Sequence, residues 1–485
     1  MALMTCVDMG RVRIERHILV IAYRETLEAS LGALSLNADL RTLIRGSLDL
    51  EGEAAAATRV VRQTEGGVGW ISVILLSAKR HRHSPAHDVF GLRKLLNADL
   101  LGVKSLGVLV ALGDDDPVHL SGMVAELARQ MPTFWCKRQA PEACRVSCAF
   151  VTQMPLSAPA RAEIEALFDS IQVCAALVDT PAQTLDCEEF SGRIREEADA
   201  LGLTYDEIVG DHLRVGGFGG LYHVGKASCV APRLLVVHYR AKGAKHRVSL
   251  VGKGIVYDTG GLCLKPRDAM SEMKGDMAGA AAVFGALLMA AKLALKVDMD
   301  AVFCLAENAI GPSAFRPDDI VTLYSGLNVE INNTDAEGRL VLGDGVAYAS
   351  RHLEPDVIID IATLTGAQLI CTGKSYAGLL TSDAGLEAAL VTAGKAVGEP
   401  VFPMLYAPDL LLGEFKSQVA DMKNSCKDRM NAQSSCAGHF VEKNLEASFA
   451  GTFAHIDIAG PASRDGRGTG FGVGLLSAYL RGLAR

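Results

Sequence analysis

Short apolar runs alternate with amphipathic stretches along the chain, and this alternation is typical of α/β proteins. In the N-terminal third, the apolar runs are rich in β-branched residues and predict strands, whereas the stretches between them have helical spacing. The predicted strands are 17–23, 70–76 and 105–112, and the predicted helices are 88–101 and 120–130. We therefore expect an α/β domain in this part of the chain rather than a β-sandwich.

A predicted long helix that starts near residue 157 joins this part to a second, more regular α/β region. It covers 157–176 and carries Pro159 in its first turn, where proline is tolerated. Further along, strands are predicted at 247–251, 299–305, 329–332 and 356–361, and helices at 277–295 and 339–353. The repeated strand–helix order favours a largely parallel sheet flanked by helices. We predict two domains, a smaller N-terminal α/β domain over 1–165 and a C-terminal domain over 166–485.

Composition and charge narrow the class of protein. Of the 485 residues, 49% are hydrophobic, which is too apolar for a disordered chain, and the net charge of −8 disfavours a nucleic-acid partner. The longest nearly apolar stretch, 277–291, is too short to span a bilayer and predicts a buried helix, so no membrane partner is expected. The 12 cysteines form no C-x-x-C pair, and the N-terminus lacks the pattern of a secretory signal. These features predict reduced thiols and a cytoplasmic location.

Two segments approach known motifs without matching them. His81, His83 and His87 have a spacing that suits a metal site, but they lie in a polar segment where nothing nearby supplies a clear acidic partner, so we expect a solvated loop. The segment 220–227 (GLYHVGKA) approaches a phosphate-binding loop. It lacks the hydroxyl residue directly after Gly-Lys, since Ser228 comes one position late. A nucleotide-hydrolysing enzyme is therefore disfavoured.

Charged residues gather in three segments of the C-terminal region. The segments are 251–265 (VGKGIVYDTGGLCLK), 273–276 (MKGD) and 332–340 (NNTDAEGRL). The first places Lys253 and Asp258 directly after a predicted strand, and the second places Asp276 at the predicted N-cap of the apolar helix. The third follows another predicted strand, so all three are expected near the carboxyl edge of the sheet, where α/β proteins bind ligands.

Each acid taken alone has an ordinary explanation. Asp276 could simply cap its helix, and Asp335 and Glu337 could form a polar turn. Taken together, four carboxylates at one edge of an apolar sheet would be costly to keep ionised without partners. Two divalent cations would balance the four charges, and oxygen ligands suit Mn²⁺ and Mg²⁺ as well as Zn²⁺. Lys253 could join them as a neutral amine ligand only if its pKa were driven down.

The stretch 250–340 resembles the leucyl (cytosol) aminopeptidase family of two-metal exopeptidases. The segment 333–340 (NTDAEGRL) is a highly specific motif of that family. The resemblance covers about 170–485, including 316–321, 359–367, 435–440, 455–462 and 469–476, and parts of it are closer to the divergent animal branch. It implies that 166–485 form the catalytic domain of a cytoplasmic, metal-dependent aminopeptidase, in which a metal-bridging water attacks a peptide with a free N-terminus. It also implies a homohexamer.

The resemblance further implies a role for each matching residue. One divalent ion would be held by Lys253, Asp258, Asp276 and Glu337, and the other by Asp258, Asp335 and Glu337. Zinc and manganese are the implied ions, with magnesium as a third candidate. Lys265 and Arg339 match the catalytic pair, and Arg339 is implied to hold a bicarbonate ion that shuttles the proton. The implied substrate pocket, lined by Met273, Thr363 and Gly366, would favour a Leu-like or other apolar N-terminal residue.

Two alternatives stay open at this stage. A binding or scaffold protein with the same fold but weak or no catalysis would keep the metal positions without turnover. A different two-metal hydrolase, such as a phosphoesterase, would use the same ions on phosphate esters. The intact set of charged positions favours the aminopeptidase over both.

Overall fold

The chain folds into two compact α/β units. The computed structural model describes residues 2–7, 9–12, 15–33, 42, 46, 55–64, 67–96, 100 and 102–484. The N-terminal unit comprises Met1–Gln172 and Gly394–Gly398, and the C-terminal unit comprises Val173–Ala393 and Glu399–Arg485. The division falls inside helix α6 (Ala158–Asp179), the helix predicted over 157–176. The predicted domain boundary at residue 165 lies in the same helix.

In the N-terminal unit, the described residues form a six-stranded sheet in the order β1-β6-β5-β2-β4-β3. Its strands are β1 (Leu3–Cys6), β2 (His17–Ala22), β3 (Ala56–Thr64), β4 (Gly67–Leu75), β5 (Ser105–Ala111) and β6 (Arg145–Phe150). All neighbouring strands are parallel except β3 and β4, which form an antiparallel pair. The three strands predicted from the sequence are therefore present as β2, β4 and β5.

Four helices described in this unit are α1 (Met9–Val12), α2 (Arg24–Ala33), α4 (Val89–Leu95) and α5 (Pro117–Arg129). Helix α5 matches the prediction for 120–130. The helix predicted over 88–101 is shorter, because the backbone of Leu96 is extended and ends α4. Residues 97–99 and 101 lie outside the described residues.

The C-terminal unit is built on an eight-stranded sheet in the order β15-β14-β17-β13-β9-β10-β8-β7. Its strands are β7 (Thr204–Val209), β8 (Arg233–Tyr239), β9 (Arg247–Asp258), β10 (Asp298–Asn308), β13 (Val357–Ala362), β14 (Ala377–Thr381), β15 (Val401–Pro403) and β17 (Thr452–Asp457). The central strands β17, β13, β9 and β10 are parallel to one another. Antiparallel pairs involving β14, β8 and β7 flank them, so the sheet is mixed with a parallel centre.

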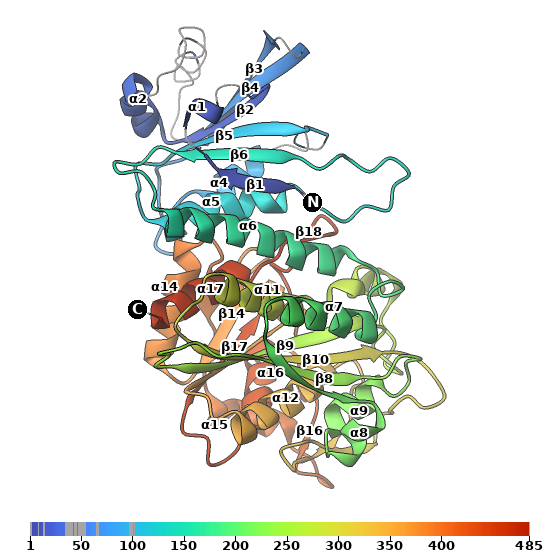
Figure 1. The fold of residues 1–485 in the computed structure, drawn as a ribbon. Coiled ribbons are helices and arrows are strands. Elements are labelled where there is room, and N and C mark those ends of the chain that lie inside the picture. The colour runs from blue at the N-terminus through green and yellow to red at the C-terminus, as the bar shows by residue number, and fades with distance from the viewer. Residues whose placement is uncertain are drawn as a thin grey trace. The chain divides into compact units, whose positions relative to one another are not determined.

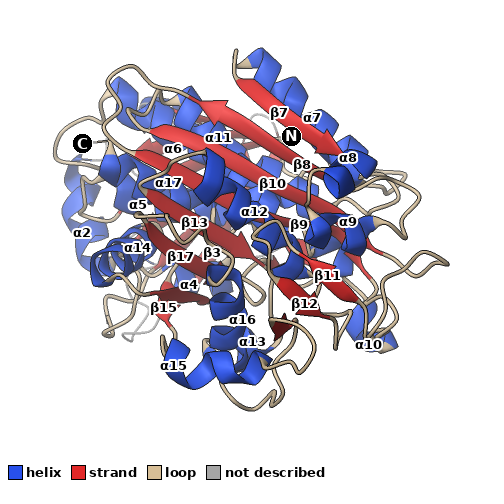
Figure 2. Ribbon diagram, turned by 90° about the horizontal axis from the view of Figure 1, so that it is seen from below, coloured by secondary structure: helices blue, strands red, loops and turns tan. Residues whose placement is uncertain are grey.

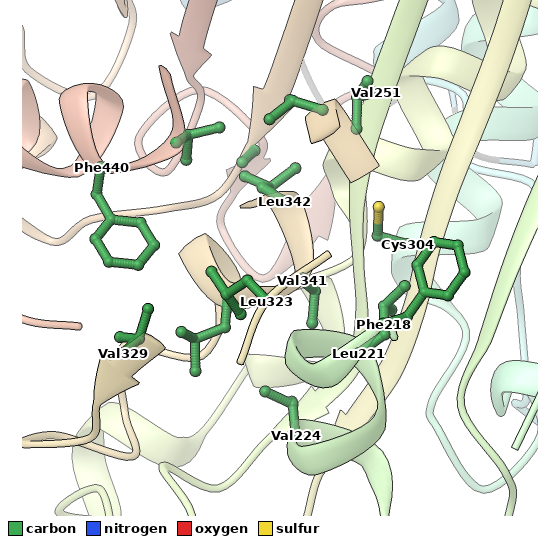
Figure 3. Close-up of a cluster of buried hydrophobic side chains, with 14 of the residues drawn as sticks. Phe218, Leu221, Val224, Val251, Cys304, Leu323, Val329, Val341, Leu342 and Phe440 are labelled. Atoms are coloured by element: carbon green, nitrogen blue, oxygen red, sulfur yellow. The ribbon is translucent and has the colours of Figure 1, made fainter. Parts of the chain in front are cut away.

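Helices cover both faces of this sheet (Figure 1). On one face lie α7 (Cys187–Ala200), α11 (Ala278–Lys292) and α17 (Val473–Leu483), and on the other lie α9 (Gly219–Gly225), α12 (Gly338–His352) and α16 (Gln433–Glu442). Figure 2 shows the second face, with the strands running side by side behind its helices. Buried side chains of α9, α12 and α16 pack on the sheet there and form the cluster in Figure 3, which includes Phe218, Leu342 and Phe440.

Shorter elements complete the C-terminal unit. They are α8 (Asp211–Val215), α10 (Arg267–Met270), η2 (Met273–Gly275), α13 (Ala367–Cys371), α14 (Ala384–Ala396), α15 (Pro408–Leu411) and η3 (Leu412–Phe415), with the small strands β11 (Ile320–Thr322), β12 (Asn328–Glu330), β16 (Met422–Lys423), β18 (Ser463–Arg464) and β19 (Arg467–Gly468). Helix α14 crosses into the segment assigned to the N-terminal unit.

The apolar helix α11 is a core helix, as the sequence predicted. The helical stretch 267–292 is long and apolar enough to cross a membrane by length and composition alone, but 83% of its most apolar window is buried inside the protein. Burial of this kind is what a helix at the centre of a folded unit shows. Its position against β9, β10 and β13 places its N-terminus beside the ends of those strands.

Strand β9 is longer than predicted, and this places two of the candidate site residues within it. The sequence suggested that the strand ends at Val251, before two glycines, whereas β9 continues to Asp258. A Cβ on Gly252 would lie 2.5 Å from the Cα of Ala280 in α11, and a Cβ on Gly254 would lie 2.4 Å from the side chain of Leu305. These glycines therefore allow α11 and the neighbouring strand β10 to pack closely against β9, and they do not form a turn.

Candidate metal centre

Charged residues from distant parts of the C-terminal unit meet at the carboxyl ends of its parallel strands. Asp258 is the last residue of β9, Asn308 is the last residue of β10 and Thr363 directly follows β13. Neighbouring parallel strands end at the same edge of a sheet, so these side chains are brought together by the topology alone. One carboxylate oxygen from each of Asp258, Asp335 and Glu337 lies within 4.8 Å of the other two.

Lys253 is buried at the centre of this group, with 2% of its surface exposed. Its Nζ atom lies 2.8 Å from both carboxylate oxygens of Asp276 and 3.0 Å from Oε1 of Glu337. It also donates to the backbone carbonyl of Thr363 at 3.0 Å. A Cβ on Gly338 would come within 2.5 Å of the Lys253 side chain, so the glycine of the NTDAEGRL segment gives this lysine its path into the site.

Lys265 reaches the same group from the loop that follows β9. Its Nζ atom lies 2.8 Å from Oδ2 of Asp258 and 2.6 Å from Oδ1 of Asp335. Its side chain is 15% exposed, and that of Asp335 is 31% exposed, so this end of the site faces solvent. The two lysines thus hold opposite ends of a cluster of four carboxylates.

Burial sets the protonation behaviour of the acids. It raises the pKa of Asp276 to about 8 and that of Asp258 to about 6, and the charge of Glu337 adds to both shifts. Burial likewise raises the pKa of Asp335. For Glu337, burial acts in the same direction, but Lys253 and Lys265 outweigh it and its pKa is lowered. The site therefore favours binding of further positive charge.

The neighbouring carboxylates raise the pKa of both lysines. Burial alone would lower the pKa of Lys253, but Asp276 and Glu337 outweigh it and its pKa is raised. The pKa of Lys265 is raised in the same way, mainly by Asp258. A neutral Lys253 ligand would thus need a bound cation nearby, because only a competing positive charge reverses the effect of the carboxylates.

Asp276 does not cap helix α11, contrary to the expectation from the sequence. The N-cap residue is Met277, which makes no side-chain capping hydrogen bond. Oδ1 of Asp276 instead accepts hydrogen bonds from Lys253 Nζ and from the hydroxyl of Thr363 at 2.7 Å. The side chain is 7% exposed and turns into the charged group rather than along the helix axis. The helix-capping explanation for this acid is therefore wrong.

Two buried residues that the sequence analysis did not single out hold the carboxylates in place. The Asn308 side-chain amide donates to Oδ1 of Asp258 at 2.8 Å and to the carbonyl of Thr334 at 3.0 Å. The hydroxyl of Thr334 donates to the carbonyl of Gly260 at 2.6 Å and accepts from the backbone N–H of Cys263 at 2.8 Å. These bonds tie the loop after β9 to the loop that carries Asp335. The signal that the sequence offered for Asn308 was its position as a polar residue shortly after the predicted strand 299–305.

Asn424 frames the same loop from the other side. Its Oδ1 accepts from the backbone N–H groups of Asn332 and Asn333 at 2.9 and 3.2 Å, and its amide donates to the carbonyls of Asn333 and Ala336 at 2.6 and 3.3 Å. It is fully buried. Nothing in its sequence neighbourhood pointed to this role, because its partners lie about ninety residues away.

Arg339 lies in the first turn of α12 with 3% of its surface exposed. Its guanidinium carbon lies over the ring of Phe440, 6.0 Å from the ring centre, and burial lowers the pKa of Arg339. Among the described residues, no group hydrogen-bonds its Nε and Nη1 atoms. A buried guanidinium with unmatched donors at the start of a helix is suited to bind a small anion.

The three residues expected to line a substrate pocket occupy different positions. Thr363 touches Asp276 directly, and the backbone carbonyl of Met273 accepts the N–H of Asp276 at 3.2 Å. Both therefore border the charged group. Gly366 precedes α13, is exposed, and has open space around the position of a Cβ in the described part of the chain. Their role in binding a substrate stays a prediction.

The residues present fit divalent metal ions. The donor set is four carboxylates, which suits Mn²⁺, Mg²⁺ and Zn²⁺. In the described residues, Oε2 of Glu337 is buried and accepts no hydrogen bond, although Glu337 is only 2% exposed. A buried carboxylate oxygen without a donor is costly unless a cation binds it.

The fold and the site together define a two-unit α/β protein with an oxygen-rich, metal-competent centre at the carboxyl ends of parallel strands. The sequence profile of the cytosol aminopeptidase family, catalytic domain, matches residues 172–477, and the chain belongs to this family. The match covers most of the C-terminal unit and contains every residue of the centre.

Relatives of the chain agree with this assignment. It is 51% identical over 312 residues to the probable aminopeptidase NPEPL1 of mouse and of human, a match that covers 64% of this chain and 60% of each relative. It is 43% identical over 315 residues to leucine aminopeptidase 1 of Caenorhabditis elegans, covering 65% of this chain and 64% of that protein. The matched stretch thus spans about three-fifths of the length of these curated relatives.

The likeness to solved structures extends over both units. Leucyl aminopeptidase from Trypanosoma cruzi has a TM-score of 0.91 at 36% identity, covering 99% of this chain and 97% of that one. The Trypanosoma brucei enzyme in complex with bestatin has a TM-score of 0.90 at 36% identity, with 99% and 95% covered. The leucine aminopeptidase of C. elegans has a TM-score of 0.87 at 31% identity over the full length of both chains.

Proposed function

We propose that the protein is a metal-dependent aminopeptidase that removes an apolar, Leu-like N-terminal residue from peptides. The observation that carries the proposal is the buried cluster of four carboxylates and two lysines at the carboxyl edge of the sheet, in a chain of the cytosol aminopeptidase family. Lys253, Lys265 and the four carboxylates that the family resemblance singled out form one connected group. The similarity to a relative bound to bestatin supports a site that accepts peptide-like molecules.

Two divalent ions would be held by the residues of the cluster. Lys253, Asp258, Asp276 and Glu337 would bind one ion, and Asp258, Asp335 and Glu337 would bind the other. When bound, such ions lower the pKa of a coordinated water and polarise the scissile carbonyl. Zinc and manganese are proposed on the chemistry of the ligands, with magnesium as a further candidate.

Lys265 would stabilise the charge that develops on the substrate. Its ammonium lies at the solvent-facing end of the cluster, beside Asp258 and Asp335, where a scissile carbonyl could approach. Its raised pKa keeps it protonated at neutral pH, so it can donate to an oxygen that becomes negative.

Arg339 would supply the site for a proton carrier. No histidine lies among the charged residues of the cluster, and each carboxylate in it is assigned to a metal ion. The unmatched donors of the buried Arg339 guanidinium support binding of a small anion such as bicarbonate. Selectivity for an apolar N-terminal residue is assigned to Met273, Thr363 and Gly366.

The remaining parts of the proposal concern the whole protein. We propose that the catalytic domain comprises residues 166–485, that the protein is cytoplasmic and that it assembles as a homohexamer. Relatives named cytosol aminopeptidases support the location. Light scattering on the purified chain tests the assembly, and a monomer would contradict it.

Hydrolysis of leucine amide by the purified chain tests the function. We expect turnover with added Mn²⁺ or Zn²⁺, loss of turnover on chelation and its return when metal is restored. Asp335→Asn should abolish the activity, whereas Asp268→Asn, which changes an exposed acid in α10, should not. Metal binding without turnover would favour a scaffold protein, and turnover of phosphate esters instead would favour a phosphoesterase.

A further inference from the structure

A second group of metal-ligating side chains lies in the N-terminal unit. His87 belongs to the loop between β4 and α4, Asp114 follows β5, and His119 lies in the first turn of α5. Strands β4, β2 and β5 are parallel neighbours, so the segments that follow them meet at one edge of the sheet. This edge is where α/β sheets place ligands.

The expectation of a solvated loop for the segment HRHSPAH is therefore wrong at its last histidine. His81 is exposed, as expected, but His87 is buried, with 7% of its surface exposed. The acidic partner of His87 is Asp114, which lies twenty-seven positions further along the chain and follows β5.

The ligand atoms of the three residues converge. Oδ2 of Asp114 lies 3.2 Å from Nε2 of His87 and 2.8 Å from Nδ1 of His119, and all three atoms lie within 4.8 Å of one another. The other oxygen of Asp114 accepts the backbone N–H of Asp116 at 2.8 Å, which fixes the carboxylate. Tetrahedral zinc holds nitrogen and oxygen ligands about 3.3–3.5 Å from one another, so both nitrogen–oxygen distances would lengthen when an ion binds.

The imidazole of His87 points to a ligand that a simple ion pair does not supply. Its Nε2 atom is buried and, among the residues that the structure describes, has no hydrogen bond of acceptable geometry despite the nearby Asp114 oxygen. On the other side of the ring, Nδ1 lies 3.0 Å from the hydroxyl of Tyr23. The same hydroxyl accepts from the Arg80 guanidinium and from the backbone N–H of Asp88. Metal binding at Nε2 requires the tautomer that carries its proton on Nδ1, which is the arrangement of metal-binding histidines.

A further feature suits a metal ion. The side chains of His119 and Asp114 are 35% and 26% exposed, which opens the group to solvent on one side. Water can therefore enter and supply a fourth ligand.

We propose that His87, Asp114 and His119 form a binding site for one divalent transition-metal ion in the N-terminal unit. Two imidazoles and one carboxylate are ligands that zinc favours, and a water completes a tetrahedral site. The site is additional to the two ions proposed for the C-terminal unit and does not depend on that proposal.

Zinc content of the full chain tests the site. The measurement is made on the double variant Asp335→Asn, Glu337→Gln, in which the C-terminal unit is expected to bind no zinc. Metal-stripped protein is loaded with Zn²⁺, desalted and analysed by mass spectrometry of the metal. We expect about one zinc ion per chain in this background, and none when His119→Ala is added. The matched control is His81→Ala, which removes an exposed histidine of the same unit and should leave the zinc in place.

Cobalt provides an independent readout. The double variant loaded with Co²⁺ should show the visible absorption of a tetrahedral site, and His119→Ala should remove it. His119 is partly exposed, so His119→Ala is expected to fold, and circular dichroism checks that it does. His87→Ala provides a second test and should likewise remove the zinc. A double variant that retains no zinc overturns the proposal, as does zinc that His119→Ala leaves unchanged. Neither result bears on the hydrolysis of leucine amide, which reads out the other site.

Discussion

Replacing Lys265 with methionine removes one charge from the candidate site and leaves the shape of the side chain nearly intact. In the structure, its ammonium touches Asp258 and Asp335 at 2.8 and 2.6 Å, at the solvent-facing end of the cluster. A single positioned donor of this kind stabilises a developing negative charge by about 2.7–4 kcal/mol, so we expect kcat to fall by about 10²–10³-fold with a smaller change in KM. The fold should survive, because the backbone N–H of Lys265 still donates to the carbonyl of Thr259.

The same contacts predict how the variant binds metal. The ammonium of Lys265 competes with cations for Asp258 and Asp335, so Lys265→Met should bind divalent ions at least as tightly as the wild-type chain. Turnover of leucine p-nitroanilide at saturating Mn²⁺ and metal content would be measured on one preparation, with Lys242→Met, an exposed lysine, as the control. A variant within about 3-fold of wild-type kcat would refute the role assigned to Lys265. A loss of kcat accompanied by loss of metal would refute it as well.

Other predictions concern the anion site, the positioning residue and pH. Arg339→Met should lower turnover by about 10²-fold or more and abolish any stimulation by bicarbonate in carbonate-depleted buffer; stimulation that persists would contradict this. Asn308→Leu removes the donor to Asp258 and should weaken metal binding by about 10–100-fold in a chelator competition, with unchanged affinity as the opposing result. Burial raises the pKa of Asp276 to about 8, so the folded metal-free protein binds a proton that the unfolded chain releases near pH 4. Its thermal stability under chelation should therefore fall as pH rises from about 4 to 8, and Asp276→Asn should flatten that slope; a wild-type stability that rises across this window would contradict the assignment.

Much of the fold follows from local pattern. The apolar runs at 17–23, 105–112 and 356–361 are strands, because an uninterrupted β-branched run suits the buried centre of a parallel sheet. The apolar helix α11 is likewise buried. The length of β9 was not predictable in this way, because Gly252 and Gly254 resemble turn residues in sequence and show their packing role only against α11 and β10.

The candidate site, too, could be predicted from the sequence only in part. Its charged residues could be predicted because they lie in short sequence motifs. The parallel topology then brings Asp258, Asp276 and Asp335 to one edge of the sheet. The residues that hold them in place could not be found locally. Asn424 lies about ninety residues from the loop that it frames, and His87 meets Asp114 only because the sheet brings the ends of β4 and β5 to the same edge. Contacts of this kind depend on tertiary structure, which a single sequence does not display.

The central claim is that acids distant in sequence bind a pair of divalent cations at the carboxyl edge of the C-terminal sheet. A crystal structure of the zinc-loaded protein, with anomalous differences collected at the zinc edge, tests it most directly. The account predicts two peaks about 3.5–4 Å apart among Asp258, Asp276, Asp335 and Glu337. The absence of any peak among these carboxylates, in crystals grown with zinc in excess, would contradict it.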